Sequence, residues 1–320
     1  MLGWEFCLSG MNFESFWLIY HRLNEGFTVF LERKILGRLE GEMMRQFDAQ
    51  TGWEDHLIPT VHGRFSENHP FTSLIPKLQG KDPNDAFSQI PYEKGSAFLM
   101  FLEQKLNDSD EFEKFMRAYI EKFAYKSVVT DVWKDFLYDY FKDKKAVLDG
   151  IDWDNWLYAT GMPKSKPVFD DSLLQQSKLL AQKWIDAYDT ELNSFTADEF
   201  MSLRPRQQMK VLDCILQAPP FSKKKVEKLG VVYNLEKVNN CELRFSWIQI
   251  GLKAQWKPII QTALNFVSAQ GRLKYVRPIY KNLFAWNETC EVAKALLEKN
   301  APLMHPLTVS VLRKLLSEPE

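Results

Sequence analysis

Apolar residues recur at intervals of three and four positions along most of the chain, the spacing that puts them on one face of an α-helix. The first clear run lies near the N-terminus, at Phe27, Phe30, Leu31, Ile35 and Leu39. It predicts a helix over residues 25–48. The following stretch, residues 48–80, is rich in glycine and proline, so we expect irregular structure there.

Further helical segments are expected before the middle of the chain. After a turn at residues 82–85, a helix begins at Pro91 and runs through Lys105. Asp110 is placed to cap a helix that reaches residue 123, and Thr130 with Asp131 to cap one that reaches residue 141. A short helical turn follows at residues 153–156.

The stretch 161–167 contains a glycine and two prolines, and we expect it to be an exposed linker. Short amphipathic patterns of similar length follow it closely, a layout typical of an α-solenoid or another layered helical domain. No strict sequence repeat accompanies them. The predicted helices cover residues 171–188, 197–201, 206–218, 222–233, 240–251, 256–270, 276–286, 289–300 and 306–316.

Composition argues against several classes of protein. The formal net charge is −1, so no overall field attracts nucleic acid or an anionic membrane. Apolar runs are shorter than the roughly 20 residues that cross a bilayer, so no membrane insertion is expected, and the first residues lack the basic start of a signal peptide. The four cysteines form no Cys-x-x-Cys pair, which favours a reducing, cytoplasmic location. The oligomeric state stays open.

Two local clusters are considered as sites and set aside. His56, His62 and His69 lie in a stretch rich in turn residues and lack the spacing of a helical ligand pair, so we interpret them as ordinary surface histidines. Lys223, Lys224 and Lys225 have no interleaved aromatic residues, and we interpret them as a solvated helix face.

Several motifs occur in a fixed order, and together they indicate a family. They include Leu-Asn-Glu-Gly at 23–26, Asn-His-Pro-Phe-Thr at 68–72, Pro-Tyr-Glu-Lys-Gly at 91–95, Trp-Asp-Asn-Trp-Leu-Tyr at 153–158, Gly-Arg-Leu-Lys-Tyr-Val-Arg-Pro at 271–278 and Met-His-Pro at 304–306. In this order the chain resembles the C-terminal half of the leukotriene A(4) hydrolase and aminopeptidase B family of zinc aminopeptidases.

The resemblance implies an all-α chain with two domains. Residues 1–165 would be the helical C-terminal part of a thermolysin-like catalytic domain, and residues 166–320 an armadillo-like α-solenoid. In the family, a β-rich domain, a glycine-rich Met-Glu-Asn segment and a His-Glu-x-x-His helix come before this stretch. The 320 residues contain no His-Glu-x-x-His.

The resemblance also implies roles for individual residues, each with a plainer alternative. Glu25 would be the third protein ligand of a Zn²⁺ ion, or simply a glutamate favoured at a helix N-terminus. The Tyr92 hydroxyl would stabilise the tetrahedral intermediate, or belong to a core tyrosine at a helix start. Arg272 and Lys274 would bind a substrate carboxylate, or form a solvated basic helix end. We expect Arg272 and Lys274 to face the same cleft as Glu25 and Tyr92.

Some positions depart from the family pattern. Relatives that open epoxides carry a tyrosine where this chain has Phe87 and an aspartate where it has Asn84, which favours an aminopeptidase over a lipid-epoxide hydrolase. Residues 19–22 interrupt the Phe-Trp-Leu-Asn-Glu-Gly run of the family. They include His21, four residues before Glu25, which would share a helical face with it. We interpret His21 as incidental.

Two hypotheses follow. The first is a zinc metallo-aminopeptidase of the leukotriene A(4) hydrolase type, which removes N-terminal residues from short peptides. Because the His pair and the general-base glutamate are absent, we expect a truncated chain that is inactive alone. The second is a non-catalytic helical scaffold or binding protein derived from that family.

Overall fold

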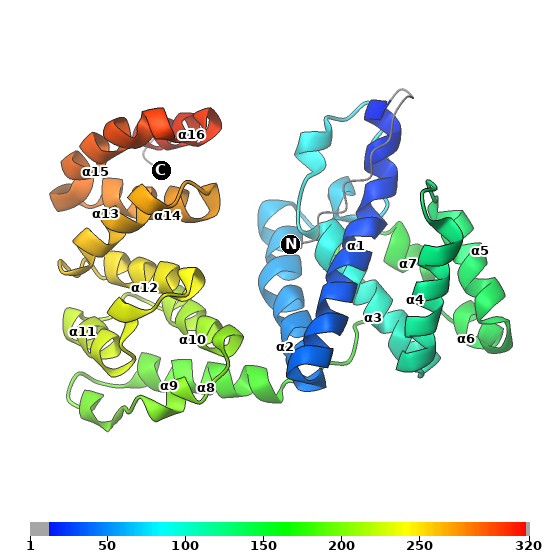
Figure 1. Ribbon diagram of the computed structural model, residues 1–320, viewed down its shortest axis with the longest axis horizontal. Coiled ribbons are helices and arrows are strands. Elements are labelled where there is room, and N and C mark those ends of the chain that lie inside the picture. Colours follow the sequence, from blue (N-terminus) through cyan, green and yellow to red (C-terminus); the bar gives the residue numbers. More distant parts are fainter. Residues whose placement is uncertain (1–12, 318–320) are drawn as a thin grey trace. The chain divides into compact units, whose positions relative to one another are not determined.

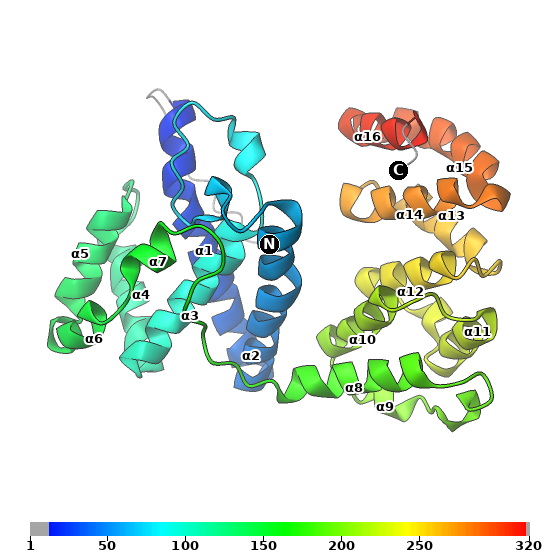
Figure 2. The ribbon, with the colours of Figure 1, turned by 180° about the vertical axis from the view of Figure 1, so that it is seen from behind.

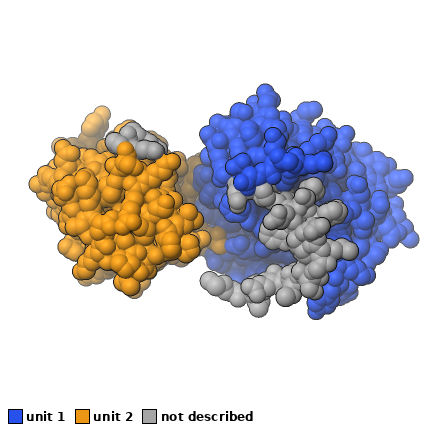
Figure 3. All heavy atoms as spheres, turned by 90° about the horizontal axis from the view of Figure 1, so that it is seen from above, with its two compact units in different colours: residues 1–172 blue, residues 173–320 orange. Residues whose placement is uncertain are grey.

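The computed structural model describes residues 13–317, with the backbone alone for residues 13–22, 83 and 84. It divides into two compact units, Met1–Ser172 and Leu173–Glu320 (Figure 3). All regular structure in the described residues is helical, which confirms the prediction of an all-α fold. None of the helices described is both long and apolar enough to cross a membrane.

Unit 1 is built around α1 and α3, which pack against each other (Figure 1). Most of their buried apolar side chains belong to one aromatic-rich core that is confined to this unit. The α-helices are α1 Phe13–Glu40, α2 Glu42–Thr51, α3 Gly95–Leu106, α4 Ser109–Phe123, α5 Thr130–Tyr140, α6 Lys145–Asp149 and α7 Trp153–Leu157. Shorter π and 3₁₀ segments are η1 Gly52–Leu57, η2 Thr60–Arg64, η3 Pro70–Thr72, η4 Pro83–Ala86, η5 Ile90–Lys94 and η6 Lys142–Lys144.

The prediction of irregular structure over residues 48–80 is wrong up to residue 64, because the chain there stays helical. The single helix predicted over 25–48 is instead α1 and α2, separated at Gly41, whose φ of 95° is accessible mainly to glycine. Gly52 then begins a π-helix rather than ending α2. Close packing requires glycine at this position, because a Cβ on Gly52 would clash with Glu93 Oε2 and Arg33 Nη2.

The predicted caps are also corrected. The α4 cap is Asp108, whose carboxylate accepts a hydrogen bond from the Glu111 N–H at 2.9 Å, and not Asp110, which lies in the first turn. Val129 takes the capping position of α5 without a side-chain hydrogen bond, so Thr130 and Asp131 are its first residues.

α1 and α3 approach so closely because two glycines face each other. A Cβ built on Gly26 would lie 2.6 Å from the Gly95 Cα, and one built on Gly95 would lie 2.8 Å from the Gly26 Cα. Both glycines belong to the sequence motifs, Asn-Glu-Gly and Pro-Tyr-Glu-Lys-Gly. Their neighbours in the sequence, Glu25 and the residues of η5, are thereby brought to the same crossing point.

The segment expected to be an exposed linker is packed on unit 1. Gly161, Pro163 and Pro167 are buried, so the expectation of exposure is wrong for them. Just beyond them, the Gln104 side chain donates to the Val168 carbonyl at 2.7 Å and accepts from the Val168 N–H at 2.9 Å. The division between the two units falls later, after Ser172. We predict that residues from about 171 onward fold independently.

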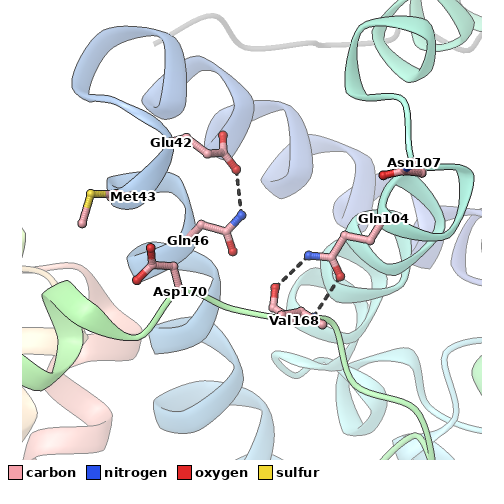
Figure 4. Close-up of a pocket in the computed structure, with 7 residues that line it drawn as sticks. All are labelled: Glu42, Met43, Gln46, Gln104, Asn107, Val168 and Asp170. Atoms are coloured by element: carbon pink, nitrogen blue, oxygen red, sulfur yellow. Dashed lines mark hydrogen bonds between the residues drawn. The ribbon is translucent and has the colours of Figure 1, made fainter.

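A pocket of about 500 Å³ lies beside this segment (Figure 4). None of the predicted site residues lines it. Gln104 and Glu42, which do, already hydrogen-bond to Val168 and Gln46 respectively. The lining residues are Glu42, Met43, Gln46, Gln104, Asn107, Val168 and Asp170.

In unit 2 the helices stack in successive layers, from α8 and α9 to α15 and α16 (Figure 1, Figure 2). α10, α12, α14 and α16 contact one another in that order, around a core confined to this unit. Each predicted helix of this half overlaps an observed one. They are α8 Ser172–Asp186, α9 Asp198–Met201, α10 Pro205–Gln217, α11 Lys223–Val232, α12 Cys241–Lys253, α13 Ile259–Ala269, α14 Leu273–Ala285, α15 Asn287–Asn300 and α16 Pro306–Ser317, with 3₁₀ turns η7 Leu192–Ser194, η8 Leu235–Lys237 and η9 Ala301–Leu303.

The glycine contact gives a prediction of unusual sign. Alanine in place of glycine inside a helix normally stabilises it by about 1 kcal/mol. We expect Gly26→Ala to destabilise unit 1 by about 1–3 kcal/mol instead, because the new methyl group would meet backbone atoms that cannot move aside. Hydrogen exchange of peptides from α1 and α3, followed by mass spectrometry, measures the change.

Gly63→Ala is the matched control, since a Cβ there meets nothing within 4 Å. It should leave protection in α1 and α3 unchanged. Equal or greater protection in Gly26→Ala than in the unsubstituted chain would show that the two backbones are not in contact.

Candidate active site

Glu25 and Tyr92 come together where α1 crosses η5. Twelve helical residues precede Glu25 in α1, so it is not a helix N-terminal glutamate and that alternative is wrong. Tyr92 lies in the π-helix η5, Ile90–Lys94, a conformation often found at functional sites. Both side chains are half-buried, and the Glu25 carboxylate lies close enough to the Tyr92 hydroxyl for its negative charge to act on it. Two of the predicted site residues therefore meet.

The environment keeps Tyr92 protonated. Burial raises the pKa of Tyr92 above its ordinary value, and the negative charge of Glu25 raises this pKa further. At neutral pH the side chain is thus a phenol with a proton to donate, as a residue that stabilises a developing oxyanion must be.

A buried ion pair fixes η5 against α1. Arg33 donates to Glu93 Oε2 at 2.8 Å, to Asp48 Oδ2 at 3.0 Å and to Ser96 Oγ at 3.1 Å. Burial would lower the pKa of Arg33, but the charges of Glu93 and Asp48 outweigh it and raise the pKa. Loss of one partner from such a buried pair costs about 3–5 kcal/mol, so Glu93 holds the turn that carries Tyr92.

Lys94 fixes the other side of η5. Its side chain is fully buried, and its ammonium donates to the carbonyl oxygens of Thr72 at 3.0 Å, Ala159 at 3.1 Å and Gly161 at 3.0 Å. Lys94 thereby joins η5 to two loops that are far apart in sequence. Three of the five residues in Pro-Tyr-Glu-Lys-Gly, namely Glu93, Lys94 and Gly95, therefore have structural roles around Tyr92.

Phe87 lies next to Tyr92. The two rings meet edge to face with centroids 6.5 Å apart, and the Phe87 side chain is 68% exposed. This ring places an apolar surface beside the Tyr92 ring. The side chain of Asn84 lies outside the described residues, so its predicted effect stays a prediction.

The histidines of the first unit do not form a site in the described residues. His69 caps η3, since its Nδ1 accepts from the Phe71 N–H at 3.1 Å, and its ring stacks on Phe65 with centroids 4.8 Å apart. His56 and His62 are exposed. The side chain of His21 lies outside the described residues, although the backbone places it on α1 four positions before Glu25.

The side chains that the structure describes do not make a complete zinc site. Catalytic zinc takes three protein ligands and keeps one position open. Glu25 contributes one carboxylate, and it already pairs with Tyr92. Among the side chains that the structure describes, no group of three or more His, Cys, Asp or Glu residues is placed to hold a metal. We therefore assign no chemical step to zinc in this chain.

Arg272 and Lys274 lie in unit 2, at the start of α14. Arg272 is exposed and takes the capping position of the helix. The Lys274 ammonium donates to Glu242 Oε1 at 2.6 Å, so it is already paired with a carboxylate of its own unit. That these two cations face Glu25 and Tyr92 stays a prediction.

Sequence reasoning missed Arg33, Lys94 and Glu242. The sequence assigns no role to Arg33 or Lys94, and only their burial reveals their partners. Nothing in the sequence around Glu242 connects it to residues about 30 positions later, since it meets Lys274 only when α12 packs on α14.

Comparison with known proteins identifies the family of this chain. The family model of the Peptidase family M1 domain matches residues 12–156, and that of Leukotriene A4 hydrolase, C-terminal, matches residues 203–316. The chain belongs to the family of leukotriene A4 hydrolases and M1 aminopeptidases. Among relatives, the leukotriene A-4 hydrolase of Xenopus laevis is 41% identical over 301 residues, and the leucine aminopeptidase 2 of Ajellomyces capsulatus is 36% identical over 311 residues.

These matches cover 94% and 96% of this chain and 48% of each relative, so the chain spans about half the length of the curated relatives it matches. Native leukotriene A4 hydrolase from Saccharomyces cerevisiae is similar in structure, with a TM-score of 0.86 at 31% identity over 94% of this chain and 50% of the yeast chain. The predicted family is thus confirmed for both halves of the chain.

The contact between Glu25 and Tyr92 leads to a prediction about titration. Glu25→Gln removes the negative charge that disfavours the phenolate, so we expect the pKa of Tyr92 to fall toward the ordinary tyrosine value while burial keeps it above that value. NMR titration of the chain labelled with ¹³C in the tyrosine rings follows each tyrosine separately, and Tyr92→Phe assigns the signal.

Tyr119 serves as the internal control. Burial raises the pKa of Tyr119 to about 12, with no carboxylate involved, so Glu25→Gln should leave that signal in place. An unchanged Tyr92 pKa in Glu25→Gln would mean that the two side chains do not touch.

Proposed function

We propose that this chain is part of a zinc aminopeptidase of the leukotriene A4 hydrolase type that acts on short peptides. Glu25 would be one zinc ligand and Tyr92 the hydroxyl donor to the reacting carbonyl oxygen. The observation that carries the proposal is that α1 and η5 bring the Glu25 carboxylate close to the Tyr92 hydroxyl, inside a frame of buried charges and close-packed glycines. A core tyrosine would not need a half-exposed hydroxyl next to a carboxylate.

Tyr92 fits this role on chemical grounds. A hydrogen-bond donor placed where negative charge develops in the transition state is worth about a hundred- to a thousandfold in rate. The raised pKa of Tyr92 keeps the donor protonated across the neutral range. Because Glu93 and Lys94 fix the turn on both sides, the hydroxyl needs little reorganisation during a reaction.

Arg272 and Lys274 would bind the free carboxylate of the peptide. A guanidinium grips a carboxylate with two hydrogen bonds, and an ammonium adds a point charge. Peptides rather than nucleic acid or membranes are the proposed partners, in keeping with the net charge of −1. The proposed compartment is the cytoplasm, which suits the absence of a disulfide at Cys214, Cys241 and Cys290.

The second candidate is a non-catalytic helical scaffold. The observation that favours it is the absence of His-Glu-x-x-His from the 320 residues, which leaves the chain without two ligands and the general base of the family. Each unit has a hydrophobic core of its own, so its fold does not require a working active site.

A chimera separates the two candidates. In it, this chain replaces the matching half of the Xenopus laevis relative, and hydrolysis of leucine p-nitroanilide is measured. We expect a zinc-dependent activity whose kcat falls about a hundred- to a thousandfold in Tyr92→Phe, because the oxyanion donor is lost. Arg272→Ala should raise KM for tripeptides more than for the anilide, which has no free carboxylate.

The 320-residue chain alone is the negative control, and it should show neither stoichiometric zinc nor hydrolysis. Tyr119→Phe is the matched tyrosine variant and should keep full activity. A chimera that is folded and holds zinc but is inactive, or one in which Tyr92→Phe has no effect, would favour the scaffold.

A further inference from the structure

In unit 2, the two cations Arg272 and Lys274 lie next to a carboxylate of the same unit, Glu242. Arg272 and Lys274 lie at the start of α14, and Glu242 lies in the first turn of α12, which packs on α14. The starts of the two helices therefore meet at one point. Helix N-termini carry partial positive charge, so this point is electropositive even before the side chains are counted.

Glu242 is held in place by two donors. Its Oε1 accepts from the Lys274 ammonium at 2.6 Å and from the Tyr275 hydroxyl at 2.7 Å. Tyr275 is only 6% exposed, so its hydroxyl is a fixed anchor rather than a mobile surface group. Burial would raise the pKa of Glu242, but these hydrogen bonds and the charges of Lys274 and Arg272 outweigh it and lower the pKa, so Glu242 is ionised at neutral pH.

The contacts of Glu242 are those that an incoming carboxylate would seek. A free peptide C-terminus is also an anion that would accept from Lys274 and be attracted by Arg272. The side chains of Lys274 and Glu242 stay 50% and 28% exposed, so a ligand from solution can reach them. With Glu242 in place, the three side chains carry one net positive charge instead of two.

We propose that Glu242 is an internal competitor for carboxylate ligands at Arg272 and Lys274. In the free chain it holds Lys274, so an incoming carboxylate binds Arg272 first and gains Lys274 only by sharing it with Glu242. Glu242 therefore sets how tightly this site takes a free carboxylate. The inference rests on the carboxylate-binding role in the proposed function and names the residue that limits it.

The test is a binding experiment on the full chain. Tri-alanine, which has a free carboxylate, and tri-alanine amide, which has none, are titrated into ¹⁵N-labelled protein, and the amide signals of residues 272–275 are followed by NMR. We expect Glu242→Gln to lower the Kd for tri-alanine by about two- to fivefold, the scale of an exposed ion pair. The Kd for tri-alanine amide should not change.

Two further variants make the result specific. Glu291→Gln is the matched control, because Glu291 also pairs with a lysine of unit 2, Lys294 at 2.8 Å, and its loss should leave tri-alanine binding unchanged. Tyr275→Phe keeps the buried ring but removes the anchor of Glu242, so it should tighten binding in the same direction by a smaller factor. Tyr275→Phe therefore tests the effect of Glu242 on carboxylate binding even if Glu242→Gln does not fold.

Unchanged or weaker tri-alanine binding in both Glu242→Gln and Tyr275→Phe would overturn the inference, as would an absence of binding to every variant. The result is separable from the proposed function. Tighter binding in Glu242→Gln alongside an inactive chimera would support the competitor and refute the enzyme. An active chimera with unchanged binding would do the reverse.

Discussion

The backbones of α1 and α3 touch at Gly26 and Gly95, and no other residue at either position would let them do so. Because these glycines follow Glu25 and η5 directly, the contact sets the distance between the predicted zinc ligand and Tyr92. The buried pair of Arg33 and Glu93 then fixes the rotation of η5, and its space is kept open by the missing side chain of Gly52. Close packing and a buried ion pair thus both fix the position of η5 relative to α1.

The two units use a similar arrangement of groups. In unit 1 the Tyr92 hydroxyl pairs with Glu25, and in unit 2 the Tyr275 hydroxyl donates to Glu242. Burial and the charge of Glu25 raise the pKa of Tyr92, and the hydrogen bond to Glu242 and burial raise the pKa of Tyr275. The second carboxylate also holds Lys274, so the charge available for a ligand depends on a residue far from it in sequence. Charge balance, and not only the presence of cations, decides what such a site can bind.

Local pattern predicted the helices of unit 2 well, because most of them have an apolar face that packs on nearby helices of the stack. It failed at residues 48–64, where Gly52 and Pro59 suggested loops although Gly52 is there to make room for Glu93 and Arg33. The family motifs named Glu25 and Tyr92, but not the buried roles of Glu93 and Lys94 or the pairing of Lys274 with Glu242. Those depend on contacts between helices distant in sequence, which a periodic pattern does not encode.

The central claim is that the glycine contact positions the site. Its most direct measurement is the pKa of Tyr92 in Gly95→Ala, read by NMR titration of ¹³C-labelled tyrosines. If the contact holds Tyr92 against Glu25, the added methyl group separates α1 from η5, and the pKa of Tyr92 falls toward its ordinary value as the carboxylate moves away. A pKa of Tyr92 that stays where it is in the unsubstituted chain, in a variant shown to be folded, would contradict the account.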